Sequence, residues 1–492
     1  MRLESHPSSL IDYAQPLSFV FNNKTYKGFK GDTLASALIA NDVIYYARSF
    51  KYGRKRGIIG AGVEEPNALV SLEIGGRYTP NMKATEVMLY NGLSAVSSSN
   101  PNSIDFRAMI KPLHRFMPAG FYYKTFIKQK VWSIVEDRLR SLSGFSKAPS
   151  ETDEDVYDHI FQHSEVLVIG GGVAGMSSAL EVLSKSKNNR VILVDERENL
   201  GGELTNEFAT DQSAAQWHQE TKDRLLEFRD EENSRLKILS SATAYAWYDH
   251  NYVEVLQTNA TGQSMKHKGV QLARKLIHKI RTKEVILATG AHERPMLFET
   301  NDLANIMLCQ SVRRYINEFN VVAGKEIVLY GNNDSIYNTA IDLINHNIKS
   351  KVIDVRAPGN ESETVIQAKD LGVKVLQGFA VRKARGKSRI TGIEISKVEM
   401  QAKPPHWKSE WRMSKDVQIL SCDLLATSGG FNPVVHLDCH CGGKTYFDNN
   451  SQSFLPQKER KNRQVCGAVN SIGFWKDAII DAKNKAQLTL YS

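Results

Sequence analysis

The sequence predicts an α/β protein in which two strand–helix–strand units follow a smaller, strand-rich domain. The two units are indicated by an apolar run, a glycine turn and a helix, which recur at 166–195 and at 325–354. The first domain is indicated by a hairpin, a short helix, a glycine-rich loop and further strands within residues 15–96. With 492 residues, 41% hydrophobic and 24% charged, the chain has the composition of a globular protein of several domains.

The first domain opens with two β-prone runs on either side of Asn22-Asn23, which predict a hairpin at 15–30. The segment GDTLASALIAND then predicts a short helix with Asp32 or Thr33 as its N-cap. Strand-like segments, VSLEIGG and ATEVMLYNGLSAV, complete the domain.

Between the helix and these strands lies a basic, glycine-rich loop at 48–70. The order of elements is typical of plant-type ferredoxin domains, in which cysteines of this loop hold a [2Fe–2S] cluster. Residues 1–308 contain no cysteine, so a cluster bound by this domain's own thiolates is excluded. The basic residues of the loop fit either a solvated surface or contact with a flavin phosphate or an acidic partner; they are Arg48, Lys51, Arg54, Lys55 and Arg56.

The first strand–helix–strand unit predicts an adenine dinucleotide, or another adenosine phosphate. After the apolar run at 166–169, Gly170 permits a tight turn, Gly172 lets a pyrophosphate approach, and Gly175 lets helix and strand pack closely. The pyrophosphate would lie on free N–H groups at the helix N-terminus. Asp195, at the end of the next apolar run, would accept hydrogen bonds from a ribose. The alternative is a degenerate unit that keeps its turn without a ligand.

Neighbouring small and acidic residues are expected to line the same site. A glycine pair follows the ribose acid in ENLGGEL, and small residues follow strands in EVILATGAHERP and DLLATSGGFNP. The additional binding residues predicted in this way are Val173, Ala174, Glu196, Gly201, Gly202, Glu203, Thr289, Gly290, Gly429 and Gly430.

The second unit repeats the layout with different residues in its turn. Gly331 stands at the first glycine position, but Asn333 and Ile336 occupy the second and third. Since side chains there obstruct a pyrophosphate, we expect this unit to be structural or a weakened nucleotide site.

The cysteine and histidine residues of the sequence indicate neither a metal site nor a catalytic residue. Cys439-His440-Cys441 lacks the second ligand pair of a structural zinc site. No C-x-x-C or C-x4-C pair occurs, which argues against a disulfide reductase. His292, as a lone ionisable residue, is expected to be an ordinary loop histidine.

Net charge, cysteine content and hydrophobic pattern limit the partners and the cellular location to be expected of the chain. A net charge of +9 with a pI near 9.0 fits an anionic cofactor, an acidic partner subunit or a generic basic surface. No nucleic-acid-binding module is recognised. Five scattered cysteines, no signal-peptide core and no membrane-length apolar stretch predict a cytoplasmic protein that contacts neither nucleic acid nor membrane.

With these segments in view, the chain resembles the α subunit of heterotetrameric sarcosine oxidase and its relatives. The resemblance rests on GDTLASALIAND, RSFKYGRKRGIIGAGVEEPNALV, ATEVMLYNGL, PAGFYYKTF, VLVIGGGVAG, ATGAHERP, the NNDSIY turn and SGGFNP, which together extend over nearly the full chain. Several of these segments are peculiar to this family.

The resemblance implies a glutathione-reductase-like fold with two dinucleotide-binding domains, the second inserted in the first, after a ferredoxin-like domain without a cluster. The limits implied are 1–110 for the ferredoxin-like domain, 111–163 for a connector, 164–296 with 425–492 for the nucleotide-binding domain, and 297–424 for the inserted domain. It also implies NAD, or FAD, in this subunit, FMN at the boundary with a β subunit that carries FAD and the amine site, and small γ and δ subunits.

Two departures from the family pattern refine this expectation. The long form of the family continues into a folate-binding domain, whereas this sequence stops at Ser492, which favours a short form related to dye-linked proline dehydrogenases and opine oxidases. FAD-binding relatives place Gly-Asp in the last turn, whereas this sequence has Cys466-Gly467-Ala468, which favours NAD or a simpler adenine nucleotide. The alternatives are a self-contained FAD-dependent NAD(P)H oxidoreductase and a non-catalytic scaffold subunit.

Overall fold

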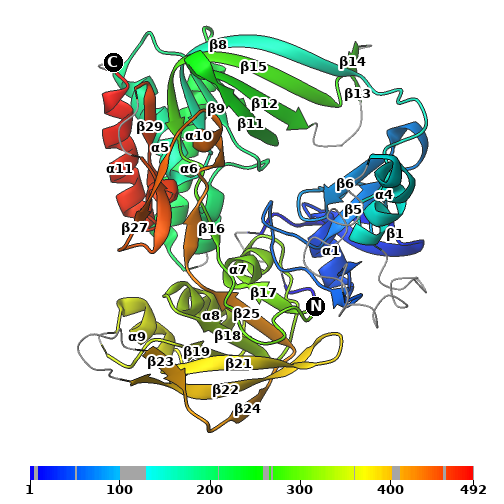
Figure 1. Ribbon diagram of the computed structural model, residues 1–492. Helices are drawn as coiled ribbons and strands as arrows, with labels where there is room; N and C mark the ends of the chain where they lie inside the picture. The colour runs from blue at the N-terminus through cyan, green and yellow to red at the C-terminus, as the bar shows by residue number, and fades with distance from the viewer. Residues whose placement is uncertain are drawn as a thin grey trace. The chain divides into compact units, whose positions relative to one another are not determined.

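The computed structural model describes residues 1–4, 9–49, 52–99, 129–208, 210–258, 265–267, 270–359, 361–401, 410–457 and 461–490. The chain forms two compact units (Figure 1). Unit 1 comprises Met1–Glu154 and Glu293–Gly430, and unit 2 comprises Asp155–His292 and Phe431–Ser492. Much of the predicted connector at 111–163, up to residue 128, lies outside the described residues.

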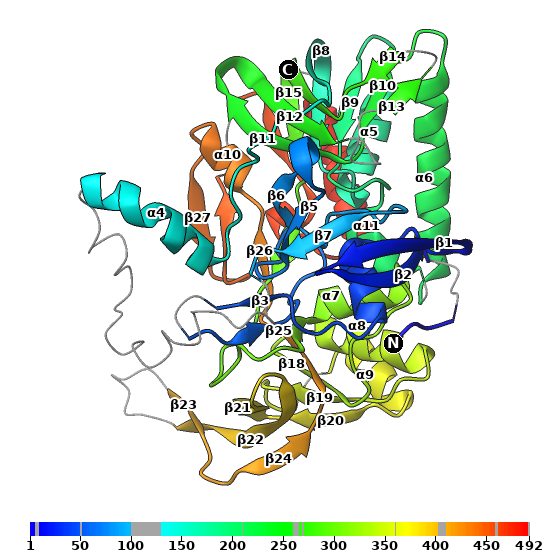
Figure 2. The ribbon, with the colours of Figure 1, turned by 90° about the vertical axis from the view of Figure 1, so that its right-hand side faces the viewer.

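The first part of unit 1 is a five-stranded sheet in the order β2-β1-β7-β5-β6. Its predicted hairpin is confirmed, since β1 and β2 pair antiparallel around Asn22 and Asn23, both at positive φ. The two strands lie side by side in Figure 2. The predicted helix is confirmed as α1, with Thr33 as its N-cap, and it packs against β2. The elements are β1 (Asp12–Phe21), β2 (Lys24–Lys30), α1 (Leu34–Ala40), β3 (Ala47–Arg48), β4 (Lys55–Arg56), β5 (Leu69–Leu72), β6 (Thr79–Lys83), β7 (Ser94–Ser97) and α4 (Gln129–Ser143).

The second part of unit 1 is a parallel sheet in the order β17-β25-β18-β19-β20, followed by antiparallel strands β21 to β24. One buried core runs through both parts, from Phe19 and Leu38 to Tyr315 and Tyr337. The elements are β17 (Ile306–Leu308), α7 (Cys309–Asn317), β18 (Ile327–Gly331), α8 (Ser335–Asn345), β19 (Ser350–Asp354), α9 (Glu363–Asp370), β20 (Lys374–Gln377), β21 (Phe379–Gly386), β22 (Ile390–Gln401), β23 (Glu410–Met413), β24 (Gln418–Ser421) and β25 (Leu424–Ser428).

Unit 2 is built on a sheet in the order β10-β9-β8-β15-β12-β11, with β29 also paired to β15. Strands β10, β9, β8, β15 and β29 are parallel, and β12 and β11 are antiparallel. The larger elements are β8 (Tyr157–Ile169), α5 (Val173–Lys185), β9 (Val191–Val194), α6 (Gln212–Asp230), β10 (Leu236–Leu239), β11 (Ala242–Tyr248), β12 (Tyr252–Thr258), β15 (Lys275–Leu287), β29 (Arg463–Val465) and α11 (Trp475–Leu488). The shorter ones are β13 (Met265–His267), β14 (Val270–Leu272), β16 (Ala291–Glu293), β26 (Phe431–Pro433), α10 (His436–His440), β27 (Thr445–Asp448) and β28 (Ser453–Pro456).

The central strand of unit 2 is buried on both faces. Val166 and Val168 of β8 pack with residues of α5 and α11, while Leu167 and Ile169 pack with residues of β11 and β12. Helices α5 and α11 lie side by side in Figure 1. An apolar run buried on both faces is typical of a parallel sheet, as the sequence predicted. Within the described ranges, no helix is long and apolar enough to cross a membrane.

Candidate functional site

The glycine turn between β8 and α5 needs glycine at its first and third positions for backbone reasons. Gly170 has φ of +108°, and a Cβ built there would lie 2.2 Å from the carbonyl oxygen of Ala288. A Cβ on Gly175 would lie 1.7 Å from the carbonyl oxygen of Gly170. These two glycines therefore let the turn close and α5 pack onto the strand end.

Gly172 has a different role, because nothing in the fold prevents a side chain there. It is the N-cap of α5, with φ of −75°, and no side chain caps the helix. A Cβ on Gly172 would have Gly202 Cα, 3.8 Å away, as its nearest neighbour. Helix α5 thus begins at Val173 and Ala174 with amide groups that no side chain caps, and glycine at position 172 places no side chain in front of them.

The predicted glycine pair lies directly on this turn. The Gly201 amide donates to the Gly171 carbonyl oxygen at 2.9 Å, and Gly201 forms a parallel bridge with Gly172. Gly202 has φ of +57°, and a Cβ there would lie 2.9 Å from Gly172 Cα. The two glycine segments therefore form one wall at the end of the sheet.

Asp195 follows β9 and is held by backbone amides. Its Oδ2 accepts from Gly171 N, and its Oδ1 accepts from Arg197 N at 2.7 Å. It is buried, whereas Glu196 is exposed. Each carboxylate oxygen can accept more than one hydrogen bond, so Asp195 keeps the capacity to bind a ribose hydroxyl. Glu203 forms an ion pair with Arg197.

The other residues predicted to line the nucleotide site belong to different units: Thr289 and Gly290 to unit 2, Gly429 and Gly430 to unit 1. In unit 2, the Thr289 hydroxyl donates to the Val434 carbonyl oxygen at 2.7 Å, and Gly290 has φ of +73° with nothing within 4 Å of a Cβ built there. In unit 1, the Gly429 amide donates to the Arg294 carbonyl oxygen at 2.6 Å, and the Arg294 amide donates to Gly430 at 2.8 Å. A nucleotide-binding role for all these residues stays a prediction.

Three further residues, which no motif in the sequence predicts, hold the glycine segments in place. The Arg197 guanidinium donates to the Gly202 carbonyl oxygen at 2.8 Å. His218 Nε2 lies 2.9 Å from the Leu200 carbonyl oxygen, and burial lowers the pKa of His218. The Asp481 carboxylate of α11 accepts from Gly467 N at 2.9 Å. The turn at Cys466-Gly467-Ala468 therefore has a carboxylate partner, which α11 supplies and the turn itself does not.

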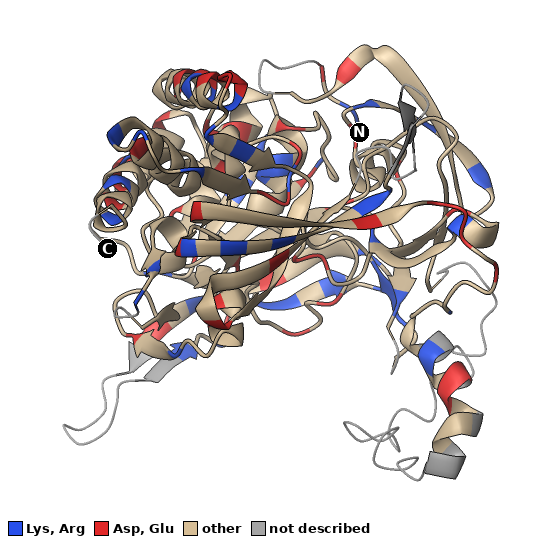
Figure 3. Cartoon of the chain, turned by 90° about the horizontal axis from the view of Figure 1, so that it is seen from above, with Lys and Arg blue, Asp and Glu red and all other residues tan. Residues whose placement is uncertain are grey.

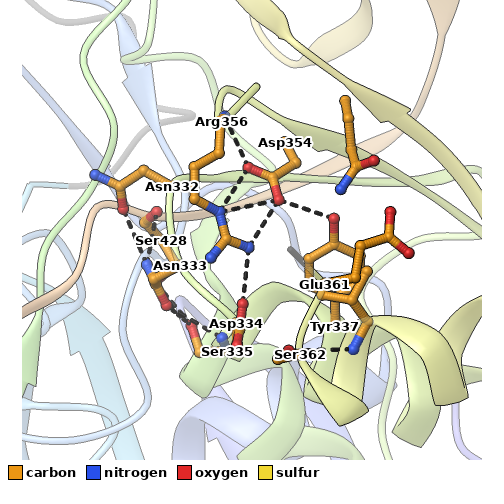
Figure 4. A network of polar contacts seen from close by, with 12 residues as sticks. Asn332, Asn333, Asp334, Ser335, Tyr337, Asp354, Arg356, Glu361, Ser362 and Ser428 are labelled. Atoms are coloured by element: carbon orange, nitrogen blue, oxygen red, sulfur yellow. Dashed lines mark hydrogen bonds and ion pairs between the residues drawn. The ribbon is translucent and has the colours of Figure 1, made fainter. Parts of the chain in front are cut away.

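The second strand–helix–strand unit is closed by its own side chains (Figure 4). Asp354, the last residue of β19, corresponds to Asp195 at the end of β9. It accepts from Tyr337 Oη at 2.8 Å and from the Arg356 guanidinium at 2.7 Å. The same guanidinium lies 2.7 Å from the Asp334 carboxylate. Asp354 is fully buried, and these hydrogen bonds raise the pKa of Arg356.

Side chains also fill the turn between β18 and α8, in the second strand–helix–strand unit, which lies within unit 1. Asn333 Nδ2 and the Ser335 hydroxyl each lie 2.9 Å from Ser428 Oγ. A Cβ on Gly331 would lie 2.7 Å from Ile336 Cγ2. The side chains at the second and third glycine positions thus occupy the turn themselves, as expected of a structural unit.

In the ferredoxin-like domain, the glycine-rich loop is organised around Glu65 rather than around thiolates. The Glu65 carboxylate accepts from Ile59 and Gly60 amides at 2.7 Å each, from Asn67 at 2.6 Å and from Ala68 at 3.0 Å. Burial raises the pKa of Glu65, and these amides oppose the shift. With no cysteine in the domain and a carboxylate on its amides, the loop does not fit a [2Fe–2S] cluster.

The basic loop residues and the Cys-His-Cys segment have local partners. Arg54 and Arg56 both bind Asp302, at 2.9 and 3.0 Å; Lys51 lies outside the described residues.

In the Cys439-His440-Cys441 segment, His440 Nδ1 lies 2.9 Å from the Trp247 carbonyl oxygen. Among the described residues, no group of three or more His, Cys, Asp or Glu side chains could hold a metal ion. His292 is half-buried in β16.

Comparisons with known proteins identify the fold of both parts of the chain. The family model described as "2Fe-2S iron-sulfur cluster binding domain" matches residues 14–100. The model described as "Pyridine nucleotide-disulphide oxidoreductase" matches residues 164–446. The structure of L-proline dehydrogenase from P. horikoshii covers 100% of this chain and 76% of its own, with a TM-score of 0.61 and 17% identity. These matches confirm the predicted fold class.

Curated relatives confirm the predicted resemblance. The sarcosine oxidase subunit alpha of Rhizobium meliloti (strain 1021) is 34% identical over 94% of this chain and 44% of the relative. That of Corynebacterium sp. (strain P-1) is 32% identical over 95% of this chain and 43% of the relative. The chain therefore spans less than half the length of the curated relatives that it matches.

Proposed function

Because the chain belongs to the pyridine nucleotide-disulphide oxidoreductase family and is homologous to sarcosine oxidase α subunits, we propose that it is the nucleotide-binding α subunit of a multisubunit amine oxidoreductase. The substrate would be a secondary amine, sarcosine or a related N-methyl or imino acid. The partner would be a β subunit that carries FAD and the amine site, with small γ and δ subunits.

The observation that carries this proposal is the uncapped start of α5 beside the glycine wall of Gly201 and Gly202. Amide groups of Val173 and Ala174 would hold a pyrophosphate there, and Asp195 would hold the adenosine ribose. NAD, or FAD, fits this site. FMN would lie at the boundary with the β subunit.

The chemistry would divide between subunits. The flavins would supply the acceptor for the hydride removed from the amine carbon. This chain would bind and orient the nucleotide and form one wall of the FMN pocket. We assign no catalytic acid or base to it, because we expect the amine site on the β subunit.

The test is to produce the full chain with and without a β-type subunit of the same organism and to measure amine-dependent dye reduction. We expect the complex, and not the lone chain, to reduce dichlorophenolindophenol with sarcosine or proline. Turnover of an amine by the lone chain would contradict the proposal, as would failure of the two subunits to associate.

The family to which the chain belongs favours one alternative, a self-contained FAD-dependent NAD(P)H oxidoreductase. Mass spectrometry of the nucleotide released from the isolated chain separates the two. NAD or an adenine nucleotide supports the α-subunit assignment. FAD together with NADH-driven bleaching supports the alternative. A non-catalytic scaffold instead requires that Asp195→Ala lower thermal stability while leaving turnover in the complex unchanged.

A further inference from the structure

One face of the unit 2 sheet carries aromatic and basic side chains across four neighbouring strands. Strands β8, β15, β12 and β11 are adjacent. In one row across them, Phe161 pairs with Lys279, and Lys279 pairs with Glu254. Two residues along, His163 pairs with Arg281, Arg281 with Tyr252, and Tyr252 with Tyr248. Residues two apart on a strand share a face, so both rows lie on the same surface. We call it the aromatic–basic face, made of Phe161, His163, Tyr245, Tyr248, Tyr252, Glu254, Lys279 and Arg281.

The two faces of these strands differ sharply in burial. On the opposite face, Val253, Ile280 and Trp247 are at most 1% exposed. On the aromatic–basic face, Phe161 is 68% exposed and Tyr245 and Tyr248 are 46% and 45% exposed. Large aromatic side chains gathered on one exposed surface are uncommon in a protein without a partner.

The rings and cations of this face contact one another. The Lys279 ammonium lies 5.1 Å from the centre of the Phe161 ring, and the Arg281 guanidinium lies 5.3 Å from that of Tyr252. The Tyr248 and Tyr252 rings are 5.8 Å apart. These contacts pre-order the side chains, which lowers the entropy lost when a partner binds.

The charge of the face is predominantly positive. Along β15, basic residues that are exposed or half-buried lie on this face at Lys275, Lys279, Arg281 and Lys283. Beyond the two rows, Glu165 of β8 lies on the same face and forms an ion pair with Arg190. Figure 3 shows the chain from above, with positions of Lys or Arg and of Asp or Glu on the strands that face the viewer. Glu254 is the acidic residue in the rows, and its two oxygens accept from Tyr245 and Tyr252 hydroxyls at 2.8 and 3.0 Å.

We propose that the aromatic–basic face docks an acidic protein surface, and that this surface belongs to the partner subunit of the proposed function, on which the assignment rests. Charge complementarity favours carboxylates opposite Lys279 and Arg281. Aromatic and arginine side chains are the residue types that contribute most to protein interfaces. A protein fits better than a nucleic acid because the curated relatives are subunits of a larger enzyme.

The test uses the full chain and a purified β-type subunit, with affinity measured by biolayer interferometry. Phe161→Ala with Tyr248→Ala, and separately Lys279→Glu with Arg281→Glu, are each expected to weaken binding about 10-fold or more. The matched controls, Ile419→Ala and Lys374→Glu, alter exposed residues of unit 1 and are expected to leave affinity unchanged. Circular dichroism and melting temperature verify that each variant folds.

Three outcomes would overturn the proposal, and they are distinguishable. A complex that forms with unchanged affinity in both double variants refutes the docking face and leaves the proposed function standing. Failure of the wild-type chain to bind the β-type subunit refutes both. Tight binding of a fluorescent 30-nucleotide single-stranded DNA that the double variants abolish would assign the face to nucleic acid.

Discussion

At the scale of single residues, the three glycines of the first turn meet three different physical demands. Gly170 is required by its positive φ and Gly175 by a backbone oxygen 1.7 Å from the place of a Cβ, so both serve the fold. Gly172 has an ordinary φ and room for a methyl group. The spacing alone cannot separate these roles, whereas the structure shows that the fold itself does not require glycine at position 172.

One prediction follows for Gly175. Gly175→Ala forces a methyl group onto the Gly170 carbonyl oxygen, so it is expected to destabilise unit 2 by several kcal/mol, about 3 or more. Gly473→Ala is the control, because nothing lies within 4 Å of a Cβ there. Urea unfolding measures the difference, and equal midpoints for the two variants would show that the turn is looser than described.

A second prediction concerns Glu65 in the cluster-free loop. Glu65→Ala leaves four amides, two of them buried, without their acceptor and is expected to lower the free energy of unfolding by about 3 kcal/mol or more. Glu399→Ala, at an exposed position of β22, serves as the control. A loss below about 1 kcal/mol would mean that the carboxylate does not organise the loop.

At the scale of elements, the buried face of the β8–β15–β12 sheet contains a polar chain across three strands. His278 Nδ1 lies 2.6 Å from Gln162 Nε2, and its Nε2 lies 2.9 Å from Gln257 Oε1. Burial, and then the charge of Lys237, lowers the pKa of His278 to about 4. The folded sheet therefore holds a neutral imidazole between two amides.

This arrangement predicts a pH dependence of stability. The unfolded chain binds a proton at His278 near its ordinary pKa of 6.5, and the folded chain only near 4. Stability from this group is therefore complete above pH 6.5 and is lost as the pH falls toward 4, by at most about 3 kcal/mol.

Melting temperatures of the wild type and of His278→Gln between pH 4 and 8 check this prediction. The wild type should lose stability relative to the variant between pH 6.5 and 4. Parallel pH profiles of the two proteins would show that His278 titrates alike in the folded and unfolded chains.

The elements differ in how far the sequence determines them. The hairpin at Asn22-Asn23, helix α1 and the unit of β8, α5 and β9 were predicted, because turn residues, a cap and apolar runs are local signals. Strands β6, β10 and β11 were not identified as strands. The first two are short, and β11 has an irregular register with β12 between Ala244 and Ala246.

Parts of the site that depend on distant residues were also missed. Asp481 reaches Gly467 from a helix that begins eight positions later in the chain. Glu65 was likewise not predicted to accept hydrogen bonds from four amides. Neither contact has a periodic or motif signal, because both depend on how the chain folds back on itself.

At the scale of the whole molecule, the two strand–helix–strand units differ in what occupies the turn after their first strand. In the first, the helix start is uncapped and flanked by glycines. In the second, Asn333, Asp354 and Arg356 fill the corresponding positions with hydrogen bonds. The first strand–helix–strand unit is therefore the one that we expect to bind a nucleotide, whereas the second shares a buried core with the ferredoxin-like domain.

The most direct measurement of this account is the affinity of the nucleotide-free full chain for NAD, by isothermal titration calorimetry, in the wild type and in Gly172→Ala. We predict that the wild type binds and that Gly172→Ala weakens binding about 10-fold or more, because its methyl group occupies the space of the pyrophosphate. The melting temperature of the nucleotide-free variant should match that of the wild type, since the fold leaves room for the methyl group. Equal affinity in the two proteins would contradict the claim that the start of α5 holds the nucleotide.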